Sequence, residues 1–152
     1  AIAGTAPAEL RNGLGIALGM QCYRAYRDIL ASDRWRKLAA AGALPQRLLW
    51  ASTSTKDPDA PDTLYAEALA APDTIDTMPD KTLAAFADHG KVDRVMAADG
   101  GDADARLARY AQAGIDVDAL ATRLQEEGAA SFVKSWNQLL RRIEDKARGL
   151  GA

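Results

Sequence analysis

The sequence predicts an α/β fold in which two parallel strands lie within a mostly helical chain. A short apolar run, Leu48 to Ala51, passes directly into a loop of hydroxyls and one lysine, as at the end of a buried parallel strand. A second segment rich in β-branched residues lies at 74–78, beyond a short helical segment. Two strands joined by a helical crossover imply a parallel pair.

Residues 7–31 are expected to form the first long helix, because apolar residues recur there at every fourth position. Three glycines interrupt this pattern, and each costs about 1 kcal/mol relative to alanine in a helix interior. We therefore expect them to permit close approach of a neighbouring element. These glycines are Gly13, Gly15 and Gly19.

A shorter helix is expected from Asp33 to about Ala41. Ser32 is a suitable N-cap, because its hydroxyl can accept from a free backbone N–H of the first turn. Trp35 and Leu38 are expected to face inward, and Gly42 to end the helix.

The first strand is expected at 46–52, followed by a loop at 53–61 that contains two prolines and two aspartates. Asp62 or Thr63 can cap a short helix, which Pro72 ends. After the second strand, the preset φ of proline predicts a helix from Pro79 to His89, ended by Gly90.

Three further helices are expected in the C-terminal part, with Gly149–Ala152 as a linker or tail. We assign residues 1–90 to units that carry the strands and residues 91–152 to a helical extension. The expected helices are about 103–113, closed by Gly114; 117–127, capped by Asp116 and closed by Gly128; and 130 to about 148, with an apolar stripe from Phe132 to Ile143.

The composition excludes several classes of protein. Nineteen basic and 21 acidic residues give a net charge of −2, which argues against nucleic-acid and anionic-membrane partners. A single cysteine, Cys22, and a single histidine, His89, exclude an intramolecular disulfide framework and the usual zinc clusters. No apolar run approaches the roughly 20 residues of a membrane span, and the first residues lack the features of a signal peptide. We expect a cytoplasmic protein without metal or cofactor.

The densest polar group next to a predicted strand end contains Arg47, the hydroxyls of residues 52–55 and Lys56. Ligands of parallel α/β folds bind at the carboxyl ends of the strands. Hydroxyls and backbone N–H groups can donate to phosphate oxygens there, while Lys56 supplies a positive charge. The alternative is that these side chains only form turns and caps.

Two other residues are candidates for either structure or function. His89 is expected to interact with the C-terminal dipole of its helix, and the alternative role is that of a general base. Tyr65, on the short helix beside the loop, can either pack in the core or line a site.

Several motifs resemble, in order and at the right spacing, the C-terminal third of plant-type and actinobacterial transaldolases, including those fused to glucose-6-phosphate isomerase. A helix motif before them, Gly15 to Tyr26, and one after them, Glu127 to Trp136, extend the resemblance over nearly the whole chain. The central motifs are Arg47-Leu-Leu-Trp-Ala-Ser-Thr-Ser-Thr-Lys-Asp-Pro, Asp62-Thr-Leu-Tyr, Asp73-Thr-Ile-Asp-Thr-Met-Pro and Phe86-Ala-Asp-His-Gly.

The resemblance implies the C-terminal portion of a (β/α)₈ TIM barrel and a transferase of the pentose phosphate pathway. Such an enzyme moves a dihydroxyacetone unit between sugar phosphates through a lysine Schiff base. It also implies that Ser52, Thr53 and Lys56 bind the substrate phosphate, with Arg47 and Tyr65 lining the site. The partners would be sugar phosphates and the remaining N-terminal part of the barrel.

No lysine of this chain stands in the family's Schiff-base context, so the resemblance implies that the catalytic lysine lies upstream and that this chain alone is inactive. Two alternatives remain open. The chain can be a catalytically silent helical packing or assembly fragment, or part of a bifunctional transaldolase/glucose-6-phosphate isomerase. The lysines are Lys37, Lys56, Lys81, Lys91, Lys134 and Lys146.

Overall fold

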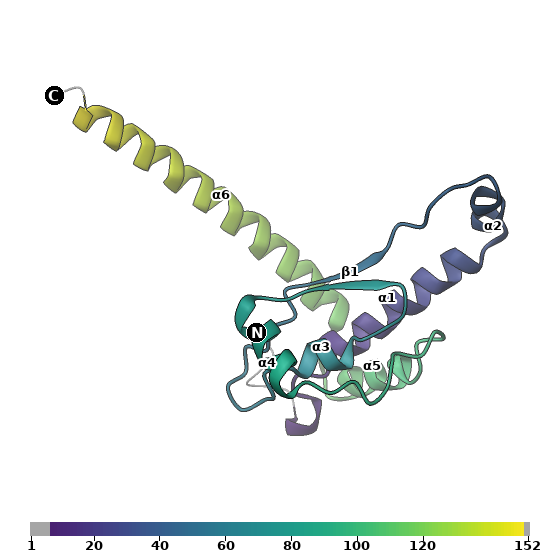
Figure 1. Cartoon of the computed structure of the whole chain (residues 1–152). Coiled ribbons are helices and arrows are strands. Elements are labelled where there is room, and N and C mark those ends of the chain that lie inside the picture. The colour runs from purple at the N-terminus through teal and green to yellow at the C-terminus, as the bar shows by residue number, and fades with distance from the viewer. Residues whose placement is uncertain (1–6, 151–152) are drawn as a thin grey trace. The chain divides into compact units, whose positions relative to one another are not determined.

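The structure is a computed structural model that describes residues 7–150 (Figure 1). By its contacts the chain divides into two units, Ala1–Ala113 and Gly114–Ala152. The division comes later than the expected boundary after Gly90. The reason is that α5 (Ala103–Gln112) packs along α1 (Leu14–Ala31) in the first unit.

The predicted helix over 7–31 is broken near its start, so that prediction was wrong for residues 7–13. A 3₁₀ turn, η1, covers Ala8–Leu10, and α1 begins only at Leu14. The break lies at Asn12, whose φ of 60° is left-handed and incompatible with a right-handed helix. Asparagine tolerates this conformation better than most residues.

At two of the three glycines a neighbouring side chain comes too close to leave room for a Cβ atom. A Cβ on Gly19 would lie 2.6 Å from Leu69 Cδ2, and one on Gly13 would lie 2.8 Å from the Tyr110 hydroxyl. At Gly15 the nearest atom would be 3.8 Å away, an ordinary contact. The expectation is therefore confirmed at Gly13 and Gly19 and is wrong at Gly15.

The helix α2 spans Asp33–Ala40, and its predicted cap and stop are confirmed. The Trp35 N–H donates to Ser32 Oγ at 3.2 Å, and Gly42 has a φ of 92°. The inward placement of Trp35 and Leu38 was wrong: Trp35 is half-buried and Leu38 is 47% exposed. No described residue of α2 is buried, because the described chain places no second apolar layer over this helix.

The two described strands are β1 (Leu48–Ala51) and β2 (Thr74–Thr77), with α3 (Leu64–Ala68) between them in the sequence. They pair in parallel, with Leu48 opposite Thr74 and Trp50 opposite Asp76, which confirms the predicted parallel pair. Both strands are shorter than expected. The first ends at Ala51 because the backbone of the next residue turns out of the extended region.

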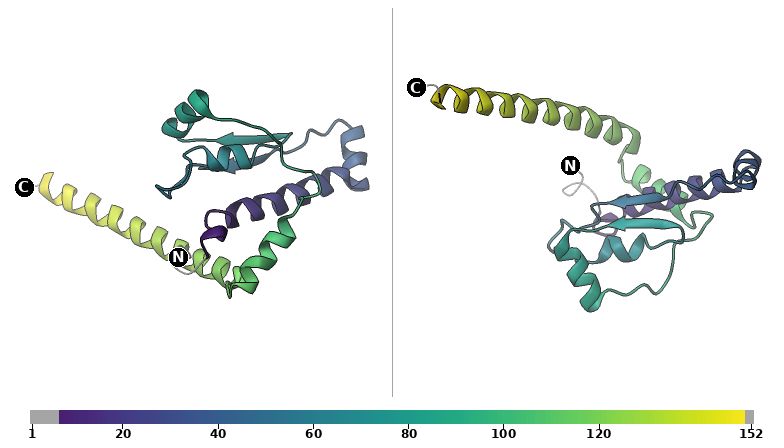
Figure 2. Two further views of the ribbon diagram at one scale, coloured as in Figure 1. Left: turned by 90° about the horizontal axis from the view of Figure 1, so that it is seen from below. Right: turned by 45° about the horizontal axis from the view of Figure 1, so that its top comes forward.

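One face of the sheet carries the core of the first unit and the other is open. Leu48 and Trp50 pack against a cluster centred on Tyr23, which is 1% exposed. Figure 2 shows α1 and α3 on the same side of the two strands. On the opposite face Leu49 and Ile75 are 47% and 39% exposed. The other members of the cluster and its neighbours are Leu69, Met96, Met20, Tyr26, Tyr65 and Ala71.

A charged bridge joins α1 to α5. Both guanidinium nitrogens of Arg24 donate to Asp104, at 2.8 and 3.2 Å, and Gln21 donates to the same carboxylate at 2.9 Å. These hydrogen bonds, that from Arg24 first, lower the pKa of Asp104 to about 2. The carboxylate therefore stays ionised, and the bridge intact, at all but strongly acidic pH.

The helix α4 runs from Asp80 to His89 between Pro79 and Gly90, as predicted. The second unit differs from the prediction. Instead of two helices separated at Gly128, one helix, α6, spans Val117–Leu150. Its cap is the predicted one, because the Ala119 N–H donates to Asp116 Oδ1 at 2.9 Å.

Gly128 does not end α6 because its cost of about 1 kcal/mol is spread over a 34-residue helix whose backbone bonds continue through it. The expected tail was wrong for Gly149 and Leu150, which belong to α6, and residues 151–152 lie outside the described part. The apolar stripe of α6 is exposed within its own unit: Phe132 81%, Val133 60%, Trp136 60%, Leu139 49%, Leu140 40% and Ile143 55%. None of the helices over residues 7–150 is long and apolar enough to cross a membrane.

Candidate functional site

The loop after β1 starts with an unusual backbone conformation. Ser52 has a φ of 56°, in the left-handed region where a residue other than glycine costs of the order of 1–3 kcal/mol. Its N–H still donates to the Thr77 carbonyl at 3.1 Å, so the sheet pairing continues to this residue. The chain then leaves the sheet with the Ser52 side chain exposed. Strained residues of this kind are concentrated at ligand sites.

Thr53 is buried at 5% exposure and fixes the loop to the second strand. Its Oγ1 donates to Asp76 Oδ1 at 2.8 Å. Burial raises the pKa of Asp76, and the bond from Thr53 partly opposes that shift. The hydroxyl proton of Thr53 is thus already used within the protein. In this conformation the contribution of Thr53 to an anion site is the position that it gives to the loop.

Other hydroxyls of the loop bond within it. Lys56 Nζ donates to Ser54 Oγ at 2.7 Å, and Thr55 Oγ1 donates to the Pro61 carbonyl at 2.8 Å. The turn-forming alternative therefore describes Ser54 and Thr55 adequately. Lys56 itself is exposed, so its ammonium group can also meet a ligand.

Lys56 and Tyr65 line one cavity of about 530 Å³. Its other walls come from residues 10–12 before α1, from the first two residues of α1, from the loop at 57–58 and from Tyr110 of α5. Tyr65 also packs against the core cluster, so it contributes both to the core and to the cavity wall. Burial, and to a smaller degree the charge of Asp57, raises the pKa of Tyr65 and keeps the phenol protonated. The full set of lining residues is Leu10, Arg11, Asn12, Leu14, Gly15, Lys56, Asp57, Pro58, Tyr65 and Tyr110.

Arg47 is not brought to this cavity. It precedes β1 and Ser52 follows it, so the two residues are separated by a four-residue strand, about 13 Å of extended chain. Ser52 and Thr53 lie one turn of loop away from Lys56. The structure therefore brings Lys56 and Tyr65 to one cavity, leaves Ser52 and Thr53 outside its lining, and places Arg47 at the opposite end of the strand.

Arg11 and Asn12 line the same cavity, although neither was predicted as a site residue from the sequence. Asn12 Nδ2 donates to Asp57 Oδ2 at 2.7 Å and so ties the start of α1 to the loop after β1. That bond is the first cause, and the Asp59 N–H the second, of a lowered pKa at Asp57. The pair Asn12-Gly13 is a turn signal that could have revealed the break before α1.

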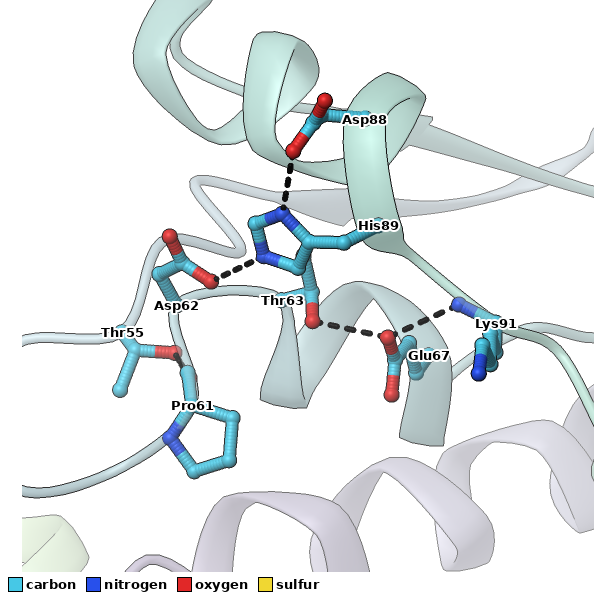
Figure 3. A network of polar contacts seen from close by, with 8 residues as sticks. All are labelled: Thr55, Pro61, Asp62, Thr63, Glu67, Asp88, His89 and Lys91. Carbon is cyan, nitrogen blue, oxygen red and sulfur yellow. Dashed lines mark hydrogen bonds and ion pairs between the residues drawn. The ribbon is translucent and has the colours of Figure 1, made fainter.

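His89 lies in a separate polar network at the end of α4 (Figure 3). Its Nε2 contacts Asp62 Oδ1 at 2.9 Å, and its Nδ1 contacts Asp88 Oδ2 at 3.2 Å. These two carboxylates, Asp62 first, raise the pKa of His89. In the same network Thr63 Oγ1 and the Lys91 N–H both donate to Glu67. His89 does not line the cavity, and it connects α4 to the start of α3.

Residues 7–150 contain no group of three His, Cys, Asp or Glu side chains that could hold a metal ion. The charged and polar residues that line the cavity are two cations, Arg11 and Lys56, one carboxylate, Asp57, the amide of Asn12 and two tyrosine hydroxyls. This set is suited to binding an oxygen-rich anion.

Comparison with known proteins identifies chains of similar sequence. The model of the "Transaldolase/Fructose-6-phosphate aldolase" family matches residues 3–143. A "Transaldolase" of Parafrankia sp. (strain EAN1pec) is 49% identical over 145 residues, which cover 94% of this chain and 39% of the relative. "Transaldolase 1" of Streptomyces avermitilis is 44% identical over 155 residues, 99% of this chain and 40% of the relative. A "Transaldolase" of Frankia alni is 48% identical over 126 residues, 82% of this chain and 34% of the relative. The chain thus spans about two fifths or less of the length of these relatives.

Proposed function

This chain belongs to the transaldolase/fructose-6-phosphate aldolase family, and we propose that it forms the C-terminal part of a transaldolase. The family has the (β/α)₈ barrel fold, so the predicted fold class is confirmed. One observation supports the proposal beyond the family. The loop from Ser52 to Lys56 follows the carboxyl end of a parallel strand, where barrels bind their substrates.

In the proposed reaction a neutral lysine amine attacks the carbonyl of a ketose phosphate and forms a Schiff base with loss of water. Carbon–carbon cleavage then releases an aldose phosphate, and the bound dihydroxyacetone unit adds to a second aldose phosphate. Water hydrolyses the new Schiff base, which releases the product ketose phosphate and regenerates the lysine amine. A carboxylate pair transfers the protons. We place the lysine and the carboxylates upstream of residue 1, because no lysine of this chain lies in the family's catalytic context.

The part of this chain in the reaction is to bind the phosphate. Lys56 and Ser52 are both exposed in the same loop, and the pair can supply one cationic and one neutral hydrogen bond to phosphate oxygens. The Thr53–Asp76 bond holds the turn between them against the sheet. Binding at a phosphate remote from the reacting carbon contributes equally to ground state and transition state, and therefore appears mainly in KM.

The partner of this chain would be the N-terminal remainder of the barrel. Two strands cannot close a barrel, and Leu49 and Ile75 are largely exposed on the open face of the sheet. Neighbouring strands would pair with the free edges, and the side chains of the remaining barrel strands would bury that face. A cytoplasmic location and a fused isomerase remain predictions from the sequence.

A second candidate function is that of a catalytically silent packing or assembly segment. The observation that favours it is the exposed apolar stripe of α6, from Phe132 to Ile143, because large exposed apolar surfaces mark interaction sites. The two candidates differ in whether the chain binds a sugar phosphate as part of an active enzyme.

Borohydride trapping with fructose 6-phosphate tests the position of the nucleophile. The isolated chain should keep its mass, whereas the full-length enzyme should gain a covalent adduct. A trapped adduct on any lysine of this chain would show that the nucleophile lies here.

Kinetics of the full-length enzyme test the phosphate site. Lys56→Ala should raise KM for phosphorylated sugars about 10- to 100-fold, since it removes a charge-assisted bond worth roughly 1.5–3 kcal/mol. Ser52→Ala should give a smaller rise, and KM for a non-phosphorylated ketose should hardly change. Equal losses on both kinds of substrate would remove both residues from the site.

A further inference from the structure

We propose that Arg11 is a second cation of the substrate-phosphate site, in the cavity at the start of α1 that Lys56 also lines. The inference rests on the proposed function and adds a specificity-determining residue to it. It is carried by the fixed backbone around Arg11, the free guanidinium group, and the charge of the cavity.

The backbone on both sides of Arg11 is held in place. Tyr110 Oη donates to the carbonyl of Leu10 at 2.6 Å, in a buried bond. Asn12 Nδ2 donates to Asp57 Oδ2 at 2.7 Å. Arg11 therefore stands between two residues that are each anchored to a different part of the first unit.

The side chain of Arg11, in contrast, is not held by a salt bridge, although its charge helps to lower the pKa of Asp57 in the same cavity. It is exposed and lines the cavity, and within the described residues its guanidinium group forms no ion pair. A pre-positioned backbone that carries a free charged group is the usual arrangement at a binding site, because less conformational freedom is lost when the ligand arrives.

Lys56 lines the same cavity from the loop after β1. The bond between Asn12 and Asp57 joins the immediate neighbours of Arg11 and Lys56, so the two cations flank one hydrogen bond. Both residues line the same cavity of about 530 Å³, which lies within the range of about 300–1,000 Å³ that is typical of small-molecule sites.

The charges that face the cavity favour an anion. Arg11 and Lys56 are positive and Asp57 is the one negative residue of the lining, so the lining carries a net charge of +1. The Asp57 carboxylate already accepts from Asn12 and from the Asp59 N–H at 3.0 Å. The remaining lining residues are uncharged: apart from Tyr65 and Tyr110 they do not ionise, and burial raises the pKa of both tyrosines further above neutral pH.

The chemistry of the two cations identifies the ligand class as a phosphate monoester of a sugar. A guanidinium group matches two phosphate oxygens with its planar fork, and an ammonium group adds a point charge. The walls of the cavity, with leucine and tyrosine side chains, can contact the carbon chain of the sugar.

Arg11→Gln in the full-length enzyme tests the inference. KM for fructose 6-phosphate should rise about 10-fold, the effect of losing one charge-assisted bond, while kcat and KM for non-phosphorylated fructose stay unchanged. Arg11→Lys keeps the charge without the fork and should give a smaller rise. Arg34→Gln, at an exposed arginine of α2, is the matched control and should change neither constant.

The outcomes separate this inference from the proposed function. If Lys56→Ala and Ser52→Ala raise KM selectively for the phosphorylated sugar and Arg11→Gln does not, the proposed function holds and the role of Arg11 is refuted. If Arg11→Gln weakens both substrates equally, its role is structural and the inference again fails. If no variant discriminates between the substrates, the proposed phosphate site itself is wrong.

Discussion

The Thr53 hydroxyl donates to the Asp76 carboxylate at 2.8 Å. This hydrogen bond links the start of the loop after β1 to the middle of β2. The bond connects the backbone turn at Ser52 to the neighbouring strand. Because Thr53 is only 5% exposed, water does not readily replace it as a donor to Asp76.

Thr53→Val should lower the free energy of unfolding by about 1–3 kcal/mol, because it leaves a half-buried carboxylate without its donor at nearly constant side-chain volume. Urea unfolding followed by circular dichroism measures this difference. Thr55→Val is the control, since the bond of Thr55 to Pro61 is exposed and its loss should cost less. Equal effects of the two variants would contradict the importance of burial at Thr53.

Two glycine-to-alanine substitutions should change stability in opposite directions. In Gly19→Ala the new Cβ would lie 2.6 Å from Leu69 Cδ2 in the core, and the repacking should destabilise the first unit by about 1–3 kcal/mol. In Gly128→Ala no atom lies within 4 Å of the new Cβ, and α6 should gain up to about 1 kcal/mol. Thermal unfolding of both variants measures the two effects. A stabilised Gly19→Ala protein would show that Leu69 can move freely.

The His89–Asp62 pair should stabilise the protein within a defined pH window. The pKa of His89 is raised, so its contribution is complete below the ordinary value of 6.5 and is lost as the pH rises through the higher folded value. The pKa of Asp62 is lowered, chiefly by His89, so its contribution is complete above 3.8 and is lost as the pH falls through the lower folded value.

The difference in melting temperature between wild type and His89→Gln should therefore be largest between pH 3.8 and 6.5 and decrease on either side. Asp62→Asn should show the same window. Asp88→Asn should have a smaller effect, because Asp88 is the weaker cause of the shift and is 85% exposed. A difference that does not vary with pH would refute the ion pair.

Local signals in the sequence were sufficient for most of the helix ends and for the parallel pair. Ser32 caps its helix and Gly42 ends it, while Pro79 and Gly90 bound α4, because each acts through its own backbone or side chain. The predicted helix end at Gly128 was wrong, because a glycine can also lie in the interior of a long helix. The break at Asn12 was not predicted, because the apolar periodicity of residues 7–31 continues across this single residue of left-handed conformation.

The candidate site could be predicted only in part. The loop from Ser52 to Lys56 is contiguous and therefore visible in the sequence. The presence of Arg11 in the same cavity as Lys56 depends on the Asn12–Asp57 bond. This bond joins residues 45 positions apart and arises only from the folded arrangement of α1 and the loop. No periodicity or motif indicates such a contact in advance.

The bond between Tyr110 and Leu10 has a consequence for the time course of folding. It joins residues 100 positions apart, and closing a loop of that length costs about 4 kcal/mol of chain entropy, more than one hydrogen bond returns. The bond must therefore form after α1 and α5 have docked. Since Leu10 and Tyr110 both line the cavity, a chain emerging from the ribosome has no complete pocket until α5 has been synthesised and docked. Acquiring the ability to bind a ligand would then coincide with the last step in the assembly of the first unit.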